Sequence, residues 1–172
     1  LYNQSLTDTS ITAEDLSKAT DESRAASLRL AETIASVVIK VLQDSYKAYT
    51  ELAESVRDLS LVSGESAEST SRFIQVLDDF QLTASDAEAS AKALKEKGLS
   101  PNIETLANLS DEFLKIQDPA ERMVFIQENL GRGGAKWVNV LGQGGDALRE
   151  MSGAISEILI LTDEQIKMYE IQ

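Results

Sequence analysis

The fold class is decided by a long run without glycine or proline, residues 28–59: LRLAETIASVVIKVLQDSYKAYTELAESVRDL. Its apolar positions recur in alternating steps of three and four, which is the heptad spacing of an amphipathic helix. They are Leu28, Ala31, Ala35, Val38, Leu42, Tyr49, Leu52, Val56 and Leu59, with Ser45 as a polar break. Thr12 or Ser10 offers an N-cap upstream, so we expect one helix over residues 12–59.

Two uses of this heptad face are open on sequence alone. The face can form a coiled coil with another copy, or it can pack on the second half of its own chain. A self-association interface would run through Leu28, Val38, Leu42, Tyr49, Leu52, Val56 and Leu59.

Beyond residue 60, glycine and proline divide the chain into short helices. We expect these at residues 65–80, 85–97, 102–116, 118–130 and 146–161, with another beginning at 162; residues 135–141 form a short segment between two glycine joints. Capping patterns mark three of the starts: Ser85–Glu88, Asp118–Glu121 and Thr162–Gln165. The prediction is an all-α fold, a long N-terminal helix followed by a compact bundle of short helices. Its expected domain ranges are 1–60, 61–161 and 162–172, the last being the start of a truncated helix.

Composition excludes several function classes. The 172 residues carry a formal net charge of −13, and they include no histidine and no cysteine. Duplex nucleic acid is therefore not expected as a ligand, because phosphate contacts need clustered Lys and Arg. Disulfides, thiolate nucleophiles, imidazole bases and most zinc sites are excluded together. We expect no cofactor, no metal and no membrane-spanning segment in this piece, which begins at Leu1 and is expected to belong to a longer protein.

Three phrases are more specific than helix packing requires. The first runs from Ser63 to Gln75, and the second runs from Gly98 to Phe113 and contains Leu109-Ser-Asp-Glu-Phe113. The third has three pieces, Asp118–Arg122, Glu128–Ala135, which contains Asn129-Leu-Gly-Arg-Gly-Gly134, and Gly144–Met151. In this order the phrases closely resemble the helical module of tail tape measure proteins from long-tailed phages and prophages. The resemblance covers about half of the chain, and Trp137-Val-Asn139 departs from the family's blander sequence after the glycine joint.

The resemblance implies a structural function. Tape measure proteins occupy the tail lumen during assembly in the host bacterial cytoplasm, and tail tube subunits polymerise around them. They set tube length and leave the virion at DNA ejection. The expected partners are therefore tail tube subunits and tail assembly proteins. The residues that carry the family phrases, and that are candidates for interaction, are Leu109, Ser110, Asp111, Phe113, Asn129, Gly131, Arg132 and Gly134, together with Trp137.

Competing interpretations are weaker but specific. A bacterial coiled-coil signalling or interaction protein would suit residues 33–39, yet the chain breaks repeatedly after Ser63. An enzyme is not expected, because the carboxylates of Asp78-Asp79 and of Asp111-Glu112 are adjacent and diverge on a helix. The glycines at 131–134 and 142–145 lack the spacing of a phosphate-binding loop. Trp137 has two readings, a core anchor or an exposed recognition patch.

Overall fold

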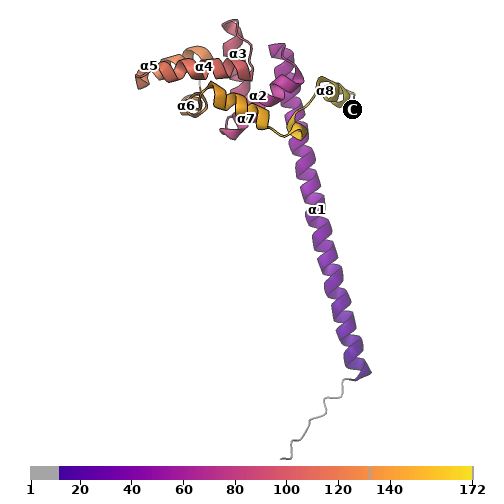
Figure 1. The fold of residues 1–172 in the computed structure, drawn as a ribbon. Coiled ribbons are helices and arrows are strands. Elements are labelled where there is room, and N and C mark those ends of the chain that lie inside the picture. The colour runs from indigo at the N-terminus through magenta and orange to yellow at the C-terminus, as the bar shows by residue number, and fades with distance from the viewer. Residues whose placement is uncertain (1–11, 132, 172) are drawn as a thin grey trace, which may run out of the picture. The chain divides into compact units, whose positions relative to one another are not determined.

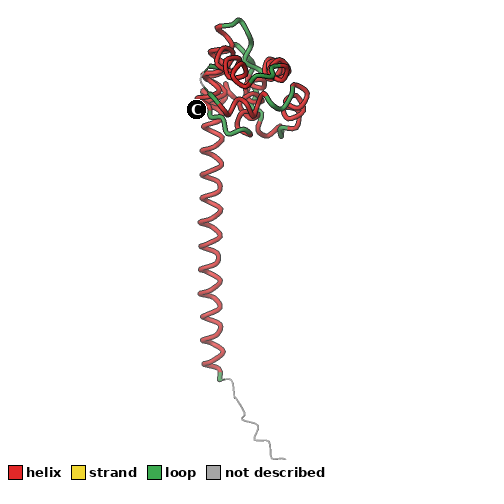
Figure 2. Tube along the Cα trace, turned by 90° about the vertical axis from the view of Figure 1, so that its left-hand side faces the viewer, coloured by secondary structure: helices red, strands yellow, loops and turns green. Residues whose placement is uncertain are grey.

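The computed structural model describes residues 12–131 and 133–171, and over these it is all-helical, as predicted. Helix α1 spans Ala13–Ser63, and short helices follow it (Figure 1). They are α2 Ala67–Asp79, α3 Ala84–Glu96, α4 Ile103–Lys115, α5 Pro119–Leu130, α6 Ala135–Leu141, α7 Gly145–Ala154, the 3₁₀ turn η1 Glu157–Leu159 and α8 Asp163–Glu170. Figure 2 shows short loops between helices and no strand in the described part of the chain.

The chain divides into two compact units, Leu1–Ala48 and Tyr49–Gln172. The described part of the first unit is the beginning of α1. Thr12 caps it: the Thr12 hydroxyl accepts from the Asp15 N–H at 3.1 Å, and the Asp15 carboxylate accepts from the Thr12 N–H at 3.1 Å. The other proposed cap, Ser10, lies outside the described residues. In this unit the apolar residues Leu28, Val38 and Leu42 are exposed.

The end of α1 was predicted four residues too early. The helix continues past Leu59 to Ser63 and stops where Gly64 adopts φ 77°, a conformation that favours glycine. Residues from Tyr49 onward belong to the second unit, and there Val56 and Leu59 are buried at 0% and 2% exposure. This last part of the heptad face therefore packs on its own chain.

The second unit contains two apolar cores. The main core is centred on Trp137, Phe73 and Phe113, and Leu59 of α1 together with residues from α2 to α7 completes it. The second core brings together the end of α1, the start of α2 and α8. Its buried members are Ala53, Val56, Ala67, Leu161 and Ile166.

Polar contacts accompany the second core. The Asp163 carboxylate accepts from the Ala67 N–H at 2.8 Å, and the Tyr169 hydroxyl donates to the Glu54 carboxylate at 3.0 Å. These contacts join residues that are about a hundred positions apart in the sequence. Thr162 and Gln165 form the predicted capping box at the start of α8.

Two other local predictions were wrong. The capping box of α3 is Thr83 with Asp86, two residues before the predicted Ser85–Glu88. The helix expected over residues 146–161 ends at Ala154, and Ile155 is extended with ψ 130°. The physical reason is tertiary: the Leu161 N–H donates to the buried Ser71 hydroxyl at 3.0 Å, and Leu161 enters the second core. Ile158, which fitted the helical pattern, is 82% exposed.

Candidate functional site

Ser110 and Asp111 on α4 contact the joint between α6 and α7. The Ser110 hydroxyl donates to the Leu141 carbonyl at 2.7 Å and accepts from the Gly144 N–H at 2.9 Å. Ser110 is completely buried, so both bonds are made away from solvent. One side chain of the second phrase therefore satisfies a backbone group of the third phrase, at Gly144, and another at Leu141, just before it.

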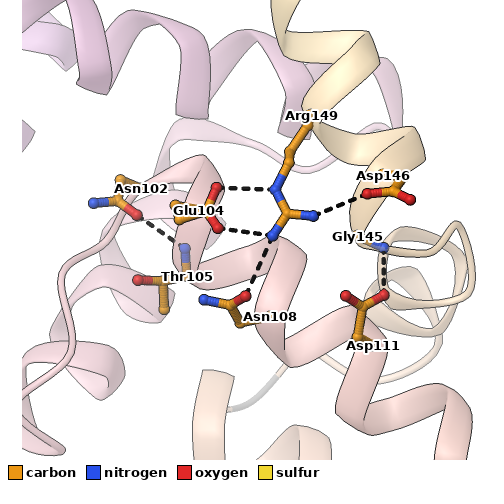
Figure 3. Close-up of polar contacts among 8 residues, drawn as sticks. All are labelled: Asn102, Glu104, Thr105, Asn108, Asp111, Gly145, Asp146 and Arg149. Carbon is orange, nitrogen blue, oxygen red and sulfur yellow. Dashed lines mark hydrogen bonds and ion pairs between the residues drawn. The ribbon is translucent and has the colours of Figure 1, made fainter.

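Asp111 caps α7 from another helix. The N-cap of α7 is Gly144 at φ 92°, which has no side chain to accept from the first N–H groups. The Asp111 carboxylate accepts from the Gly145 N–H at 2.8 Å and places negative charge at the positive end of the helix (Figure 3). An added Cβ at Gly145 would lie 2.5 Å from the Asp111 carboxylate and 2.7 Å from the Ala107 carbonyl. Position 145 therefore requires glycine, because α4 packs too close to leave room for a side chain.

Arg149 extends the α4–α7 contact along the surface. Its guanidinium donates to both oxygens of the Glu104 carboxylate, at 2.9 and 2.7 Å, and to Asp146 at 3.2 Å (Figure 3). A longer bond of 3.3 Å reaches the Asn108 amide oxygen. The hydrogen bonds that Arg149 donates to Glu104 lower the pKa of Glu104 and raise the pKa of Arg149. Both side chains remain partly in solvent, so this pair orients the helices more than it stabilises them.

Glu104 and Arg149 were not among the predicted site residues, although both lie within the quoted phrases. In the sequence each looks like an ordinary charged residue on a solvated helix face. Because 45 residues separate them, no local pattern connects the two. The pairing becomes visible only when α4 and α7 are placed side by side.

Leu109 and Phe113 serve the main core. Leu109 is 5% and Phe113 is 1% exposed. The Phe113 ring lies 6.2 Å from the Phe125 ring, centroid to centroid, and the Arg122 guanidinium lies 5.0 Å above Phe113. The Arg122 side chain also donates to the Ile116 carbonyl at 2.7 Å, which joins the end of α4 to α5. The apolar positions of the second phrase are thus packing residues.

The Asn129–Gly134 phrase is a helix end followed by a turn. Asn129 donates to the Phe125 carbonyl at 2.8 Å and accepts from the Lys97 ammonium at 3.2 Å. Gly131 ends α5 at φ 76°, and Gly134 precedes α6 at φ 54°. Arg132 lies outside the described residues. Gly131 and Gly134 thus adopt positive φ values that favour glycine, and they mark a helix end and a helix start as predicted.

Trp137 is a core anchor. Its side chain is 1% exposed, so the alternative of an exposed recognition patch is wrong. A Cβ at Gly133 would overlap the Trp137 ring, so this glycine lets the turn lie directly against the indole. Trp137 is thus the largest side chain of the main core.

A shallow depression of about 550 Å³ lies beside the α4 phrase, and Asn108, Asp111, Glu112 and Lys115 line its polar part. Asp111 already accepts from Gly145, so its carboxylate has a structural partner. Over the described residues there is no cluster of three or more carboxylates that could hold a metal ion. No described helix is long and apolar enough to cross a membrane.

Comparison of the chain with known protein families, with curated proteins and with solved structures finds no match in any of the three.

Proposed function

We propose that this chain is a segment of a phage or prophage tail tape measure protein, with a structural and not a catalytic role. The observation that carries the proposal is the contact between two phrases of the resemblance. Ser110 and Asp111 belong to the second phrase, and their partners Gly144 and Gly145 belong to the third. Phrases that occur in the family's order and also bond to each other behave as one module.

The beginning of α1 supports a role as a ruler. A helix rises about 1.5 Å per residue, so residues 13–48 span about 54 Å. A chain built from such helices relates its residue number directly to a length. In the proposed function, tail tube subunits would polymerise around this helix in the host cytoplasm, and the chain would lie in the tail lumen.

The charge distribution supports a lumen protein that shares its channel with DNA. Residues 49–172 contain 22 of the 29 acidic side chains and 11 of the 16 basic ones. The second unit thus carries a net charge of −11, and like charge would repel the DNA backbone and favour release at ejection. Tight binding of duplex DNA to the chain at physiological salt would contradict this part of the proposal.

The test is a deletion in the parent gene of the phage. Removing residues 20–47 takes out 28 residues, four heptads, and leaves the compact unit that begins at Tyr49 intact. The expected result is a tail shorter by about 42 Å in electron micrographs. The control replaces the same 28 residues with an unrelated heptad helix of equal length, and its tails should keep their length. Unchanged tails in the deletion would refute a ruler role for this segment.

A coiled-coil signalling or interaction protein is the second candidate. The exposed apolar residues of α1, such as Val38 and Leu42, favour it because a partner helix would cover them. The length of the parent reading frame separates the two candidates. Many hundreds of residues dominated by helix would support the tape measure, whereas a frame that closes within about 200–300 residues would be too short to span a tail.

A further inference from the structure

The break between α7 and α8 has no residue that stops a helix by its own conformation. Helices α1, α3 and α5 end at or just before a glycine with positive φ, at Gly64, Gly98 and Gly131. Residues 154–171 contain neither glycine nor proline, and yet Ile155 leaves the helix with φ −61° and ψ 130°. The capping box of α8 favours a helix start, but it lies about two turns after the break. Contacts with other elements must therefore hold the chain in its broken form.

Two neighbouring residues of α2 hold the two ends of the break. The Arg72 guanidinium donates to the Ser152 carbonyl at 2.6 Å. In a continuous helix this carbonyl would accept from the N–H of residue 156, so Arg72 replaces the missing helical bond. At the other end, the Ser71 hydroxyl accepts from the Leu161 N–H at 3.0 Å. Each contact stands in for a bond that a continuous helix would make within itself.

The second core adds an apolar restraint at the same place. Leu161 and Ile166 are 1% and 7% exposed, and they pack there with Val56 of α1 and Ala67 of α2. The Asp163 carboxylate accepts from the Ala67 N–H at 2.8 Å and fixes the start of α8 on the same core. We infer that the break is kept by the docking of α8.

The sequence of this stretch also fits a single helix. At 100° per residue, one set of apolar side chains between residues 148 and 169 falls on a stripe about 100° wide. The set is Leu148, Met151, Ile155, Ile158, Leu159, Ile166 and Tyr169. In the broken form Ile158 is 82% and Leu159 is 44% exposed, whereas Ile160 and Leu161, which lie off the stripe, are buried. The broken form and a continuous helix would thus use different apolar side chains of the same stretch.

We propose that residues 145–171 are a two-state element. With the second core closed they form α7, η1 and α8, and when that core opens they join into one continuous helix. The closed form predominates in the isolated chain, because it buries Leu161 and Ile166 that a continuous helix would leave in solvent. The element couples the end of α1 to the direction in which the chain leaves α7. The inference goes beyond the proposed function and does not depend on it, since it concerns contacts within the second unit alone.

The test is the backbone conformation of residues 155–161 in the full chain, read from ¹³Cα chemical shifts by NMR. In the wild-type chain, Ile155 and Ser156 should give non-helical shifts. Ile166→Asp places a charge in the second core and should open it, and the shifts of residues 155–161 should then become helical. Met168→Asp is the matched control, because residue 168 lies on the same helix and is 64% exposed, and it should keep the wild-type shifts.

A proline variant separates a continuous helix from an α8 that is merely loosened. Ser156 has φ −59° and ψ 131°, which suits a residue before proline, and Glu157 is the first residue of η1, where proline is tolerated. Glu157→Pro alone should therefore keep the wild-type shifts. Combined with Ile166→Asp, it should prevent the helical shifts, whereas Glu157→Ala combined with Ile166→Asp should allow them.

Fluorescence of Trp137 checks in each variant that the main core remains folded. If Ile166→Asp also loses this signal, Ser71→Ala decides, because it frees the Leu161 N–H without adding charge and should move the same shifts part of the way to helical values. Disordered residues 155–161 in the opened variant would overturn the proposal, since α8 would then unfold without joining α7. Unchanged shifts would overturn it as well, since the second core would then not hold the break.

Discussion

The Asp111 carboxylate on α4 accepts a hydrogen bond at 2.8 Å from the Gly145 N–H, the first residue of α7. This bond supplies the N-terminal cap that Gly144 cannot provide, and it requires that residue 145 have no side chain. It is therefore the natural starting point for mutational tests of the module.

Gly145→Ala should lower the free energy of unfolding by about 1–3 kcal/mol, because the new methyl group would force α4 and α7 apart. Chemical denaturation measured by circular dichroism checks this. Gly153→Ala is the matched control on the same helix: nothing lies within 4 Å of its added Cβ, so it should be neutral or stabilising by up to about 1 kcal/mol. Equal stability of the two variants would contradict the assigned contact.

Ser110→Ala should cost about 1–3 kcal/mol of stability, since the Leu141 carbonyl and the Gly144 N–H both lose a buried partner. Ser90→Ala provides the comparison. Ser90 is equally buried, but its hydroxyl donates only to the Ala87 carbonyl of its own helix, and we expect a cost below about 1 kcal/mol. Thermal unfolding of the two variants side by side measures the difference, and a larger loss in Ser90→Ala would refute the assignment.

The Glu104–Arg149 pair predicts an acid-dependent contribution to stability. The pKa of Glu104 is lowered in the folded chain by the hydrogen bonds from Arg149. A carboxyl whose folded pKa is below its unfolded value stabilises the fold above the unfolded pKa, and this contribution is lost as pH falls through the folded pKa. The free energy of unfolding should therefore decrease as the pH is lowered below about 4.5, the ordinary pKa of Glu. Glu104→Gln should remove part of this decrease.

Glu112→Gln is the control for this experiment, because it removes an exposed carboxyl from the same helix and leaves the Arg149 contact in place. Added salt should weaken the Glu104 effect, since the pair is open to solvent. A Glu104→Gln variant with the same acid dependence as Glu112→Gln would show that the pair contributes nothing measurable.

Trp137 is the only tryptophan, so its fluorescence reports on the main core directly. Because its side chain is 1% exposed, emission should be blue-shifted and protected from acrylamide, and it should shift to longer wavelengths in denaturant. Trp137→Ala should cost about 3–5 kcal/mol. Val124→Ala, at a site that is 52% exposed, should stay within about 0.5 kcal/mol. Strong quenching in the native chain would contradict the burial.

The local part of the fold could be predicted from sequence because its signals lie within one turn of helix. Asp118 caps α5 as expected, Asn102 caps α4, and Gly98 follows α3 at φ 74°. These signals act between residues two to four positions apart. The capping of α3 was misplaced because Thr83–Asp86 and Ser85–Glu88 both fit the pattern, and only the backbone distinguishes them.

The contacts between helices could not be predicted in the same way. Ser110 and Leu141 are 31 positions apart, and no periodicity connects them. The end of α7 illustrates the same limit. Residues 155–161 keep a helical pattern of apolar positions, but the Leu161 N–H bonds the Ser71 hydroxyl and Leu161 packs in the second core, so the helix does not continue. Tertiary packing overrode local propensity there.

The second core also has a mechanical consequence. It joins the end of α1 to α8, and the Asp163–Ala67 and Tyr169–Glu54 contacts lie across the same junction. Tension applied to α1 and to the residues after α8 would act first on these contacts. The main core around Trp137 lies in the stretch of chain between them, so it would carry no load until α8 had detached. The second unit would then extend in two steps, the second core opening first.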